Sequence, residues 1–105
     1  MKSLITIILF LFSFFSYGQK YTLLEINAKW NSANNVELPK ILGVSNQFAF
    51  LEDQNSDLKS KIKAVPIVVL YKDSKPVHQW TANLSFKLVL TEQEIRKVLL
   101  EVSKN

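Results

Sequence analysis

The stretch that decides the fold is Leu24-Glu25-Ile26-Asn27-Ala28-Lys29-Trp30-Asn31-Ser32-Ala33-Asn34. It follows Tyr21-Thr22-Leu23, and residues 21–28 together predict a mostly buried strand. The polar residues after this segment include Asn and Ser, which are common at the first position of a helix. The stretch therefore predicts a strand that ends in a polar turn and leads into a helix.

The helix after this turn is expected over residues 35–42. Its apolar residues Val36, Ile41 and Leu42 have helical spacing. Pro39 should kink the helix or lie near its start, because proline removes one helical hydrogen bond. Gly43 is a candidate for the position just past the helix end.

The middle of the chain predicts two further strands with a short helix between them. Residues 47–52 favour a strand, and Ser56 or Asp57 can begin a short helix that ends near residue 63. Residues 66–71 give the strongest strand signal. Their continuous β-branched run is typical of a strand that is buried on both faces.

A hairpin and a final helix complete the predicted order. Residues 72–75 favour a tight turn and residues 76–81 a partner strand. In the last segment Thr91 and Glu94 form a capping box. An apolar stripe at helical spacing follows, made by Ile95, Val98, Leu99 and Val102.

The predicted order is β-α-β-α-β-β-α. A right-handed crossover makes the first two strands parallel, and the last two pair as an antiparallel hairpin. With helices on both faces, this order predicts an α/β domain. We expect a four-stranded mixed sheet inside a three-layer α/β/α sandwich.

Three landmarks resemble the thioredoxin family. Residues 24–30 resemble the strand that leads into the thioredoxin active site, including its Ala-x-Trp. Pro39 follows Asn34 by five residues, where thioredoxins carry a helix-kinking proline. Residues 64–73 resemble the segment that holds the family's cis-proline, here Pro66. The resemblance spans residues 22–104 and implies a minimal thioredoxin-like fold without the family's extra N-terminal strand and helix.

The chain departs from the family at the residues that perform its chemistry. Asn31 and Asn34 stand at the two positions of the Cys-x-x-Cys motif, and the chain has no cysteine. Thiol–disulfide exchange requires a thiolate that attacks and a thiol that resolves the mixed disulfide. We therefore expect no such enzyme activity from this chain. Glu25 matches the family's buried acid, and the sequence leaves open whether it is buried or faces outward.

No other catalytic set is expected. His78 is the only histidine, and Glu52 and Asp53 are interpreted as solvated carboxylates rather than an acid–base pair. A single histidine with scattered acids is a poor zinc site. A glycine-rich phosphate loop is missing as well. We expect no metal site and no cofactor.

The resemblance implies a groove in which the active-site turn and the proline loop hold an extended peptide. The candidate partner-binding surface consists of Trp30, Asn31, Ser32, Ala33, Asn34, Val65 and Pro66. Trp30 has two interpretations: it packs the turn against the sheet, or it is an exposed contact for a partner. The leading hypothesis is a non-catalytic module that binds a protein or peptide. The alternatives are an oxidoreductase homologue acting with thiols from a partner and an accessory subunit of an envelope assembly.

The N-terminal residues predict export. Lys2, an apolar run over residues 4–15 and small residues before Gln19 indicate a signal peptide over residues 1–18, with the domain over residues 19–105. The alternative is an uncleaved anchor. Loss of Lys2 lowers the net charge from +4 to +3, and the remaining charges are interspersed. We expect a periplasmic or extracellular protein that binds no nucleic acid and, after cleavage, no membrane.

Overall fold

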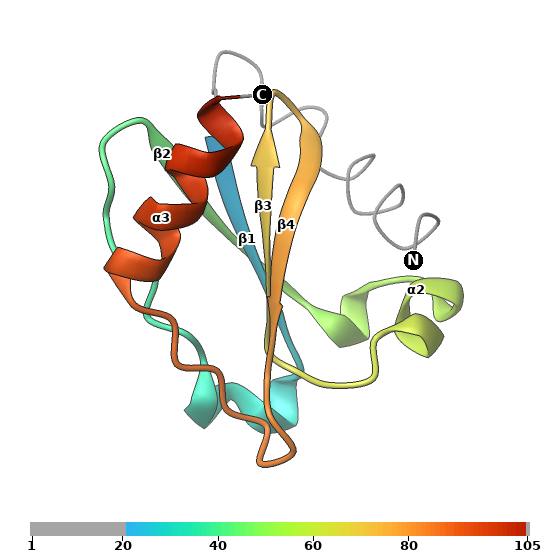
Figure 1. The fold of residues 1–105 in the computed structure, drawn as a ribbon. Coiled ribbons are helices and arrows are strands. Elements are labelled where there is room, and N and C mark those ends of the chain that lie inside the picture. Colours follow the sequence, from blue (N-terminus) through green and yellow to red (C-terminus); the bar gives the residue numbers. More distant parts are fainter. Residues whose placement is uncertain (1–20, 105) are drawn as a thin grey trace.

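A computed structural model describes residues 21–104, and the predicted signal peptide over residues 1–18 lies outside them. The described chain is an α/β domain built on one mixed sheet of four strands, in the order β2-β1-β3-β4 (Figure 1). The strands are β1 (Tyr21–Asn27), β2 (Val44–Phe50), β3 (Ile67–Lys72) and β4 (Lys75–Thr81). The predicted four-stranded mixed sheet is confirmed.

The parallel β1–β2 pair and the antiparallel β3–β4 hairpin also match the prediction. β1 runs parallel to β2, from Tyr21 opposite Val44 to Asn27 opposite Phe50. β3 is antiparallel to both β1 and β4. The hairpin between β3 and β4 turns at Asp73 and Ser74, whose φ angles are 49° and 68°. A turn with two positive φ angles suits the right-handed twist of the two strands.

Two helices cover opposite faces of the sheet (Figure 1). α2 (Ser56–Lys61) places Leu58 against one face, and α3 (Glu92–Ser103) places Ile95 against the other. Side chains alternate along the central strands, so both faces are apolar. The α2 face holds Leu24, Ile26, Ile67, Val69 and Tyr71, and the α3 face holds Leu23, Val68, Leu70, Ile41 and Leu90.

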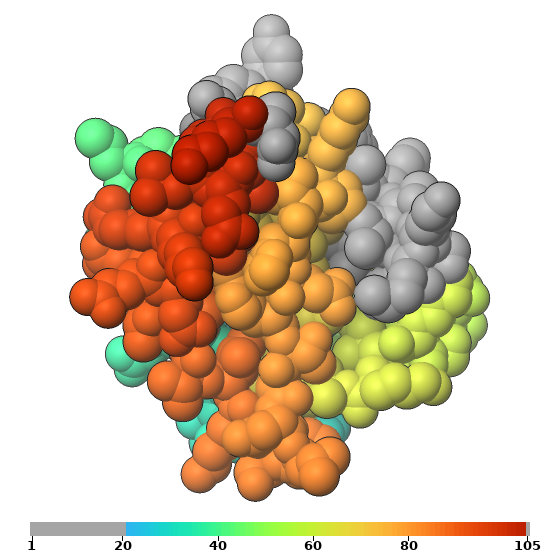
Figure 2. Space-filling view, viewed as in Figure 1, coloured from blue at the N-terminus to red at the C-terminus, as the bar shows by residue number. Residues whose placement is uncertain are grey.

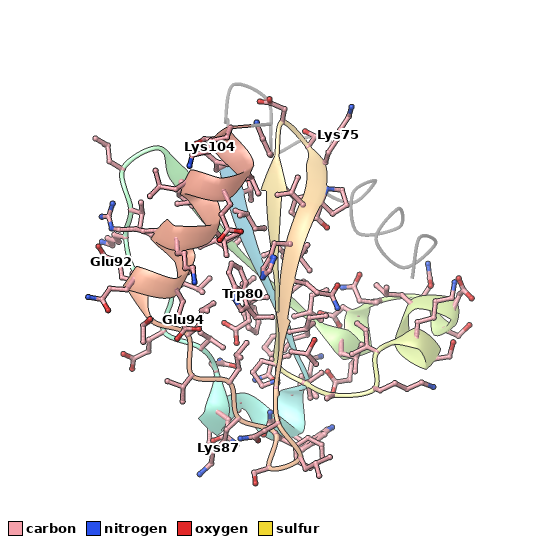
Figure 3. The ribbon with its side chains drawn as sticks, in the orientation of Figure 1. Lys75, Trp80, Lys87, Glu92, Glu94 and Lys104 are labelled. Atoms are coloured by element: carbon pink, nitrogen blue, oxygen red, sulfur yellow. The ribbon has the colours of Figure 1, made fainter. Side chains whose placement is uncertain are left out.

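Both helices begin at a side-chain cap. In α3 the Glu94 backbone N–H donates to Thr91 Oγ1 at 3.1 Å, as the predicted N-cap requires. The Thr91 hydroxyl donates to Glu94 Oε1 at 3.2 Å, and Glu94 marks the first turn of the helix in Figure 3. α2 begins at Asn55, whose Oδ1 accepts from the Leu58 N–H at 2.8 Å. The prediction of Ser56 or Asp57 as the cap was therefore wrong by one or two residues.

The helix predicted over residues 35–42 is wrong. The turn after β1 is a short 3-10 helix, η1 (Lys29–Asn34). It ends at Asn34, because Asn35 has the extended angles φ −56° and ψ 141°. The Val36 N–H donates to Glu25 Oε2 at 2.8 Å instead of to a helical carbonyl. Pro39 lacks an N–H and disfavours helical dihedrals at Leu38. The apolar residues that suggested a helix still reach the core from an irregular segment, as Ile41 shows.

The second strand lies earlier in the chain than predicted. It spans residues 44–50 rather than 47–52, and Leu51–Asp53 forms a 3-10 turn, η2. The shift follows from Gly43, which has φ +85° and does not end a helix. It lies in a turn in which the Val44 N–H donates to Ile41 O at 3.0 Å. This turn brings the chain alongside β1 at Val44.

Candidate functional site

The candidate site lies where β1 runs into η1, and two buried asparagines hold it together. Asn27 Nδ2 donates to the backbone oxygen of Asn31 at 3.0 Å, and Asn31 Nδ2 donates to Asn27 Oδ1 at 3.0 Å. Asn27 Oδ1 also accepts from the Ala28 N–H at 2.9 Å. Because both side chains are almost fully buried, these bonds compensate for the loss of water.

Asn31 also joins the turn to two distant loops. Its Nδ2 lies 3.1 Å from the backbone oxygen of Phe86 and 3.4 Å from that of Val65. Asn27 Oδ1 is the third acceptor around the same nitrogen. Three oxygens around one amide fix which end is the NH₂, since the reverse orientation would set oxygen against oxygen. Asn31 thereby connects η1, the segment before β3 and the loop over residues 82–90.

Asn34 donates from Nδ2 to Asn31 Oδ1 at 2.8 Å. The two positions that the thioredoxin resemblance equates with cysteines are therefore linked by a hydrogen bond between amides. Neither amide is a nucleophile for disulfide exchange. The arrangement can position the backbone but supplies no attacking group.

Trp30 is the most exposed aromatic residue of this region. Its side chain is 66 % exposed and belongs to neither core cluster, so of the two interpretations the structure favours the exposed one. It packs edge-to-face against Phe86, with ring centroids 5.1 Å apart. Phe86 is 40 % exposed. The pair presents two aromatic rings to solvent beside η1.

The loop that carries Phe86 is internally braced. Asn83 Oδ1 accepts from the N–H groups of Ser85 and Lys87, at 2.8 and 3.3 Å, and the Phe86 N–H donates to Asn83 O at 3.1 Å. Phe86 has φ +60°, an unusual angle for a side chain with a Cβ. This loop forms the lower end of the molecule beside η1 (Figure 2), with Lys87 at the same end (Figure 3).

The structure separates the predicted surface into exposed and buried members. Besides Trp30, the exposed members are Ser32 and Ala33, and Asn34 is half-buried. Asn31, Val65 and Pro66 are buried, and the Val65–Pro66 bond is cis. The buried members can support a contact surface but cannot touch a partner in this conformation.

Sequence reasoning missed Phe86 as a member of the site. It lies more than fifty residues after Trp30, in a segment to which no element was assigned. The two regions meet through the hydrogen bond from Asn31 to the Phe86 carbonyl and the ring contact between Trp30 and Phe86. The run Asn83-Leu84-Ser85-Phe86, with apolar residues in a polar loop, was the available signal.

Glu52 fixes the start of η1. Its two carboxylate oxygens accept from the Lys29 backbone N–H at 2.9 and 3.0 Å. The Lys29 ammonium lies 3.5 Å from an oxygen of Asp53 and 5.5 Å from the centre of the Phe50 ring. Glu52 and Asp53 are exposed, in agreement with the prediction, but Glu52 also performs this structural task.

Glu25 is buried beneath the segment that follows η1. It is 3 % exposed, and its carboxylate accepts the hydrogen bond from Val36 described above. Burial raises the pKa of this carboxyl above its ordinary value, and the hydrogen bond from Val36 offsets part of that rise. The sequence had left its orientation open. In the structure Glu25 ties the irregular segment to the sheet.

The rest of residues 21–104 offers few other sites. His78 is exposed on β4, and its ring centroid lies 4.6 Å from that of Trp80; Trp80 lies between β4 and α3 (Figure 3). Within these residues no group of three or more His, Asp or Glu side chains could hold a metal ion. None of the helices between residues 21 and 104 has the length and apolar character needed to cross a membrane.

Comparison of the sequence with models of known protein families and with curated proteins identified no match.

Proposed function

We propose that this protein is an exported, thioredoxin-like domain without thiol redox activity that binds an extended segment of a protein through an aromatic surface. The aromatic surface comprises Trp30, Ser32, Ala33 and Phe86. The observation that carries the proposal is the exposed edge-to-face pair of Trp30 and Phe86 on a base fixed by Asn31.

The fold part of the proposal rests on topology. A parallel β1–β2 pair, an antiparallel β3–β4 hairpin and the order β2-β1-β3-β4 agree with a minimal thioredoxin-like sheet. Helices on both faces agree with its three layers. The irregular segment over residues 35–43 departs from it, because the family resemblance implies a helix there.

The binding part rests on how the aromatic surface is supported. Exposed aromatic rings supply much of the energy in many protein interfaces. Binding costs less when the contacting groups are already ordered. The hydrogen bonds of Asn31 fix the backbone next to Trp30. The hydrogen bonds of Asn83 fix the loop that carries Phe86. The surface is thus ready to receive an extended chain with apolar side chains.

The test compares three proteins as baits in extracts of the cell envelope and the medium: the wild type and two variants. Trp30→Ala removes the larger ring and should lower recovery of the bound protein at least tenfold. Val77→Ala is the matched control, because Val77 is 39 % exposed on β4, away from this surface. Equal recovery with all three baits would contradict the proposal and would favour an accessory subunit that uses another surface.

A disulfide-reduction assay tests the absence of redox activity. The purified protein should reduce a disulfide substrate no faster than buffer does, because the chain has no cysteine. The assay should be repeated with a thiol-containing peptide added, since this condition tests the alternative of thiols supplied by a partner. A rate above that of the peptide alone would support that alternative.

A further inference from the structure

The two edges of the sheet differ in their protection against pairing with another strand. The β4 edge carries Lys75 and Pro76, and its register with β3 shifts between Leu70 and Tyr71. Charged residues, proline and irregular register are the usual means by which edge strands avoid association. The β2 edge has none of them. Its seven residues contain no charge and no proline, and its register with β1 is unbroken.

Within residues 21–104 no strand pairs with the outer side of β2, because β2 ends the sheet. The strand also exposes aromatic surface. Phe48 is 42 % exposed and contacts Phe50 edge-to-face, with centroids 4.9 Å apart. Neither ring packs into a core cluster. An open strand with two aromatic rings outside the core clusters is suited to association.

An apolar groove lies at the other end of the same strand. Its volume is about 470 Å³, and its lining includes Val44 at the start of β2, Leu42 before it, and Leu99 and Leu100 of α3. The start of β2 lies beside α3 at the surface (Figure 2). Val44 and Phe50 are six residues apart, so their side chains point to the same face, about 20 Å apart along the strand.

We propose that the protein forms a symmetric dimer in which β2 pairs antiparallel with β2 of a second copy, giving a continuous eight-stranded sheet. With the two-fold axis at Gln47, Val44 lies opposite the partner's Phe50, and Asn46 lies opposite the partner's Phe48. The axis therefore sets the aromatic end of each strand beside the groove end of the other.

The β2 edge is complementary to itself, which indicates that its partner is a second copy of the chain. An isologous interface requires the same surface to carry both a projecting group and its receiving site, at equal distances from the axis. β2 carries Phe50 at one end and the groove beside Val44 at the other. No charged residue of β2 faces its equivalent across the axis, although the chain has a net charge of +4. Like charges placed directly opposite each other would oppose pairing.

The test is the oligomeric state of the purified protein by sedimentation velocity over a range of concentrations. The wild type should dimerise, and Phe48→Lys should raise the dimer dissociation constant at least tenfold. The double variant Asn46→Glu/Phe48→Lys should restore it to within about threefold of wild type. In the proposed register, the carboxylate introduced at position 46 of one copy lies opposite the ammonium introduced at position 48 of the other, and the two-fold axis repeats this pair.

Val77→Lys is the matched control, since Val77 is 39 % exposed on the β4 edge, and it should leave the dimer unchanged. A wild type that stays monomeric at the highest concentration would overturn the proposal, and so would a dimer that Phe48→Lys does not weaken. Asn46→Glu also removes the hydrogen bond from Asn46 Nδ2 to Pro39 O. A double variant that is folded but does not recover dimerisation would therefore overturn the register. Far-ultraviolet circular dichroism of each variant shows whether a loss of dimer is a loss of fold. This test is independent of Trp30, so its result does not depend on the binding function proposed above.

Discussion

Asn31 shows how one buried side chain can join several segments of a fold. Its amide nitrogen faces oxygens of Asn27, Val65 and Phe86, and its amide oxygen accepts from Asn34. The side chain is 4 % exposed, so water does not compete for these bonds. The residue fixes three segments relative to one another. Its contribution to the free energy of folding therefore exceeds that of any single hydrogen bond.

Replacing Asn31 with alanine should therefore strongly destabilise the folded protein. The change leaves buried oxygens of Asn27 and Val65 without this donor, and each such group costs about 1–3 kcal/mol. We expect Asn31→Ala to lower the free energy of unfolding by about 3 kcal/mol, measured by urea denaturation. Asn34→Ala removes one bond from a half-buried side chain and should cost about 1 kcal/mol or less. Equal losses in the two variants would contradict the central role of Asn31.

Glu25 gives a prediction that depends on pH. Burial raises the pKa of its carboxyl in the folded protein above the ordinary value of 4.5. The folded state thus binds the proton more tightly than the unfolded state does, and folding stability falls as the pH rises from about 4.5 through the folded pKa. Glu25→Gln does not titrate but keeps an oxygen for the Val36 N–H.

The melting temperature of Glu25→Gln relative to wild type should therefore increase between about pH 4 and pH 7. Each 1 kcal/mol corresponds to about 4–8 °C in a domain of this size. Thermal denaturation of both proteins across this pH range measures the difference. As the reference, Glu37→Gln makes the same substitution at an exposed position. A constant difference for Glu25→Gln would show that its ionisation does not affect folding.

At the scale of elements, the turn at Gly43 decides where β2 begins. Its φ of +85° strains any residue with a Cβ, while no atom beyond its chain neighbours lies within 4 Å of where a Cβ would be. The cost of Gly43→Ala is therefore conformational rather than steric, about 1–2 kcal/mol. Gly43→Asn should cost less, because asparagine tolerates this region better. Chemical denaturation of both variants tests the order, and equal losses would argue against backbone strain.

The elements that the sequence predicted well are those with a single strong local signal. β3 is a β-branched run, and α3 has a cap and an apolar stripe, so local chemistry and burial agree. Residues 35–42 mislead because Val36, Ile41 and Leu42 keep helical spacing while the backbone of the segment is irregular. The bond from Val36 to Glu25 joins positions eleven residues apart, and no local pattern reports it.

The sequence predicted only part of the candidate site. Trp30 and the exposed turn follow from the run after β1, but burial of Asn31, Val65 and Pro66 does not. Asn31 donates to the backbone oxygens of Val65 and Phe86, and these contacts between distant segments depend on the complete fold. Phe86 became part of the site for the same reason. Contacts between segments far apart in the chain are the part that residue patterns alone leave open.

At the scale of the whole molecule, the domain relies on its apolar core because the chain has no disulfide. The sheet is covered unequally. α3 is twelve residues long and contacts its face through Ile95, Val98, Leu99 and Val102. α2 is six residues long, and Leu58 is its only buried residue. A helix this short is not stable without tertiary contacts.

Because the two helices cover the sheet unequally, we expect different effects from truncating Ile95 in α3 and Leu58 in α2. Ile95→Ala and Leu58→Ala each delete a fully buried side chain, a change that typically costs about 2–5 kcal/mol. Ile95→Ala should lower the melting temperature of the whole domain, because α3 covers the centre of the sheet. Leu58→Ala should cost less globally, since α2 can detach as a local unit while the strands stay paired. Amide hydrogen exchange separates the two cases: Leu58→Ala should lose protection in residues 56–61 but keep it in β1 and β3. Uniform loss of protection in Leu58→Ala would show that α2 is part of the same cooperative unit as the sheet.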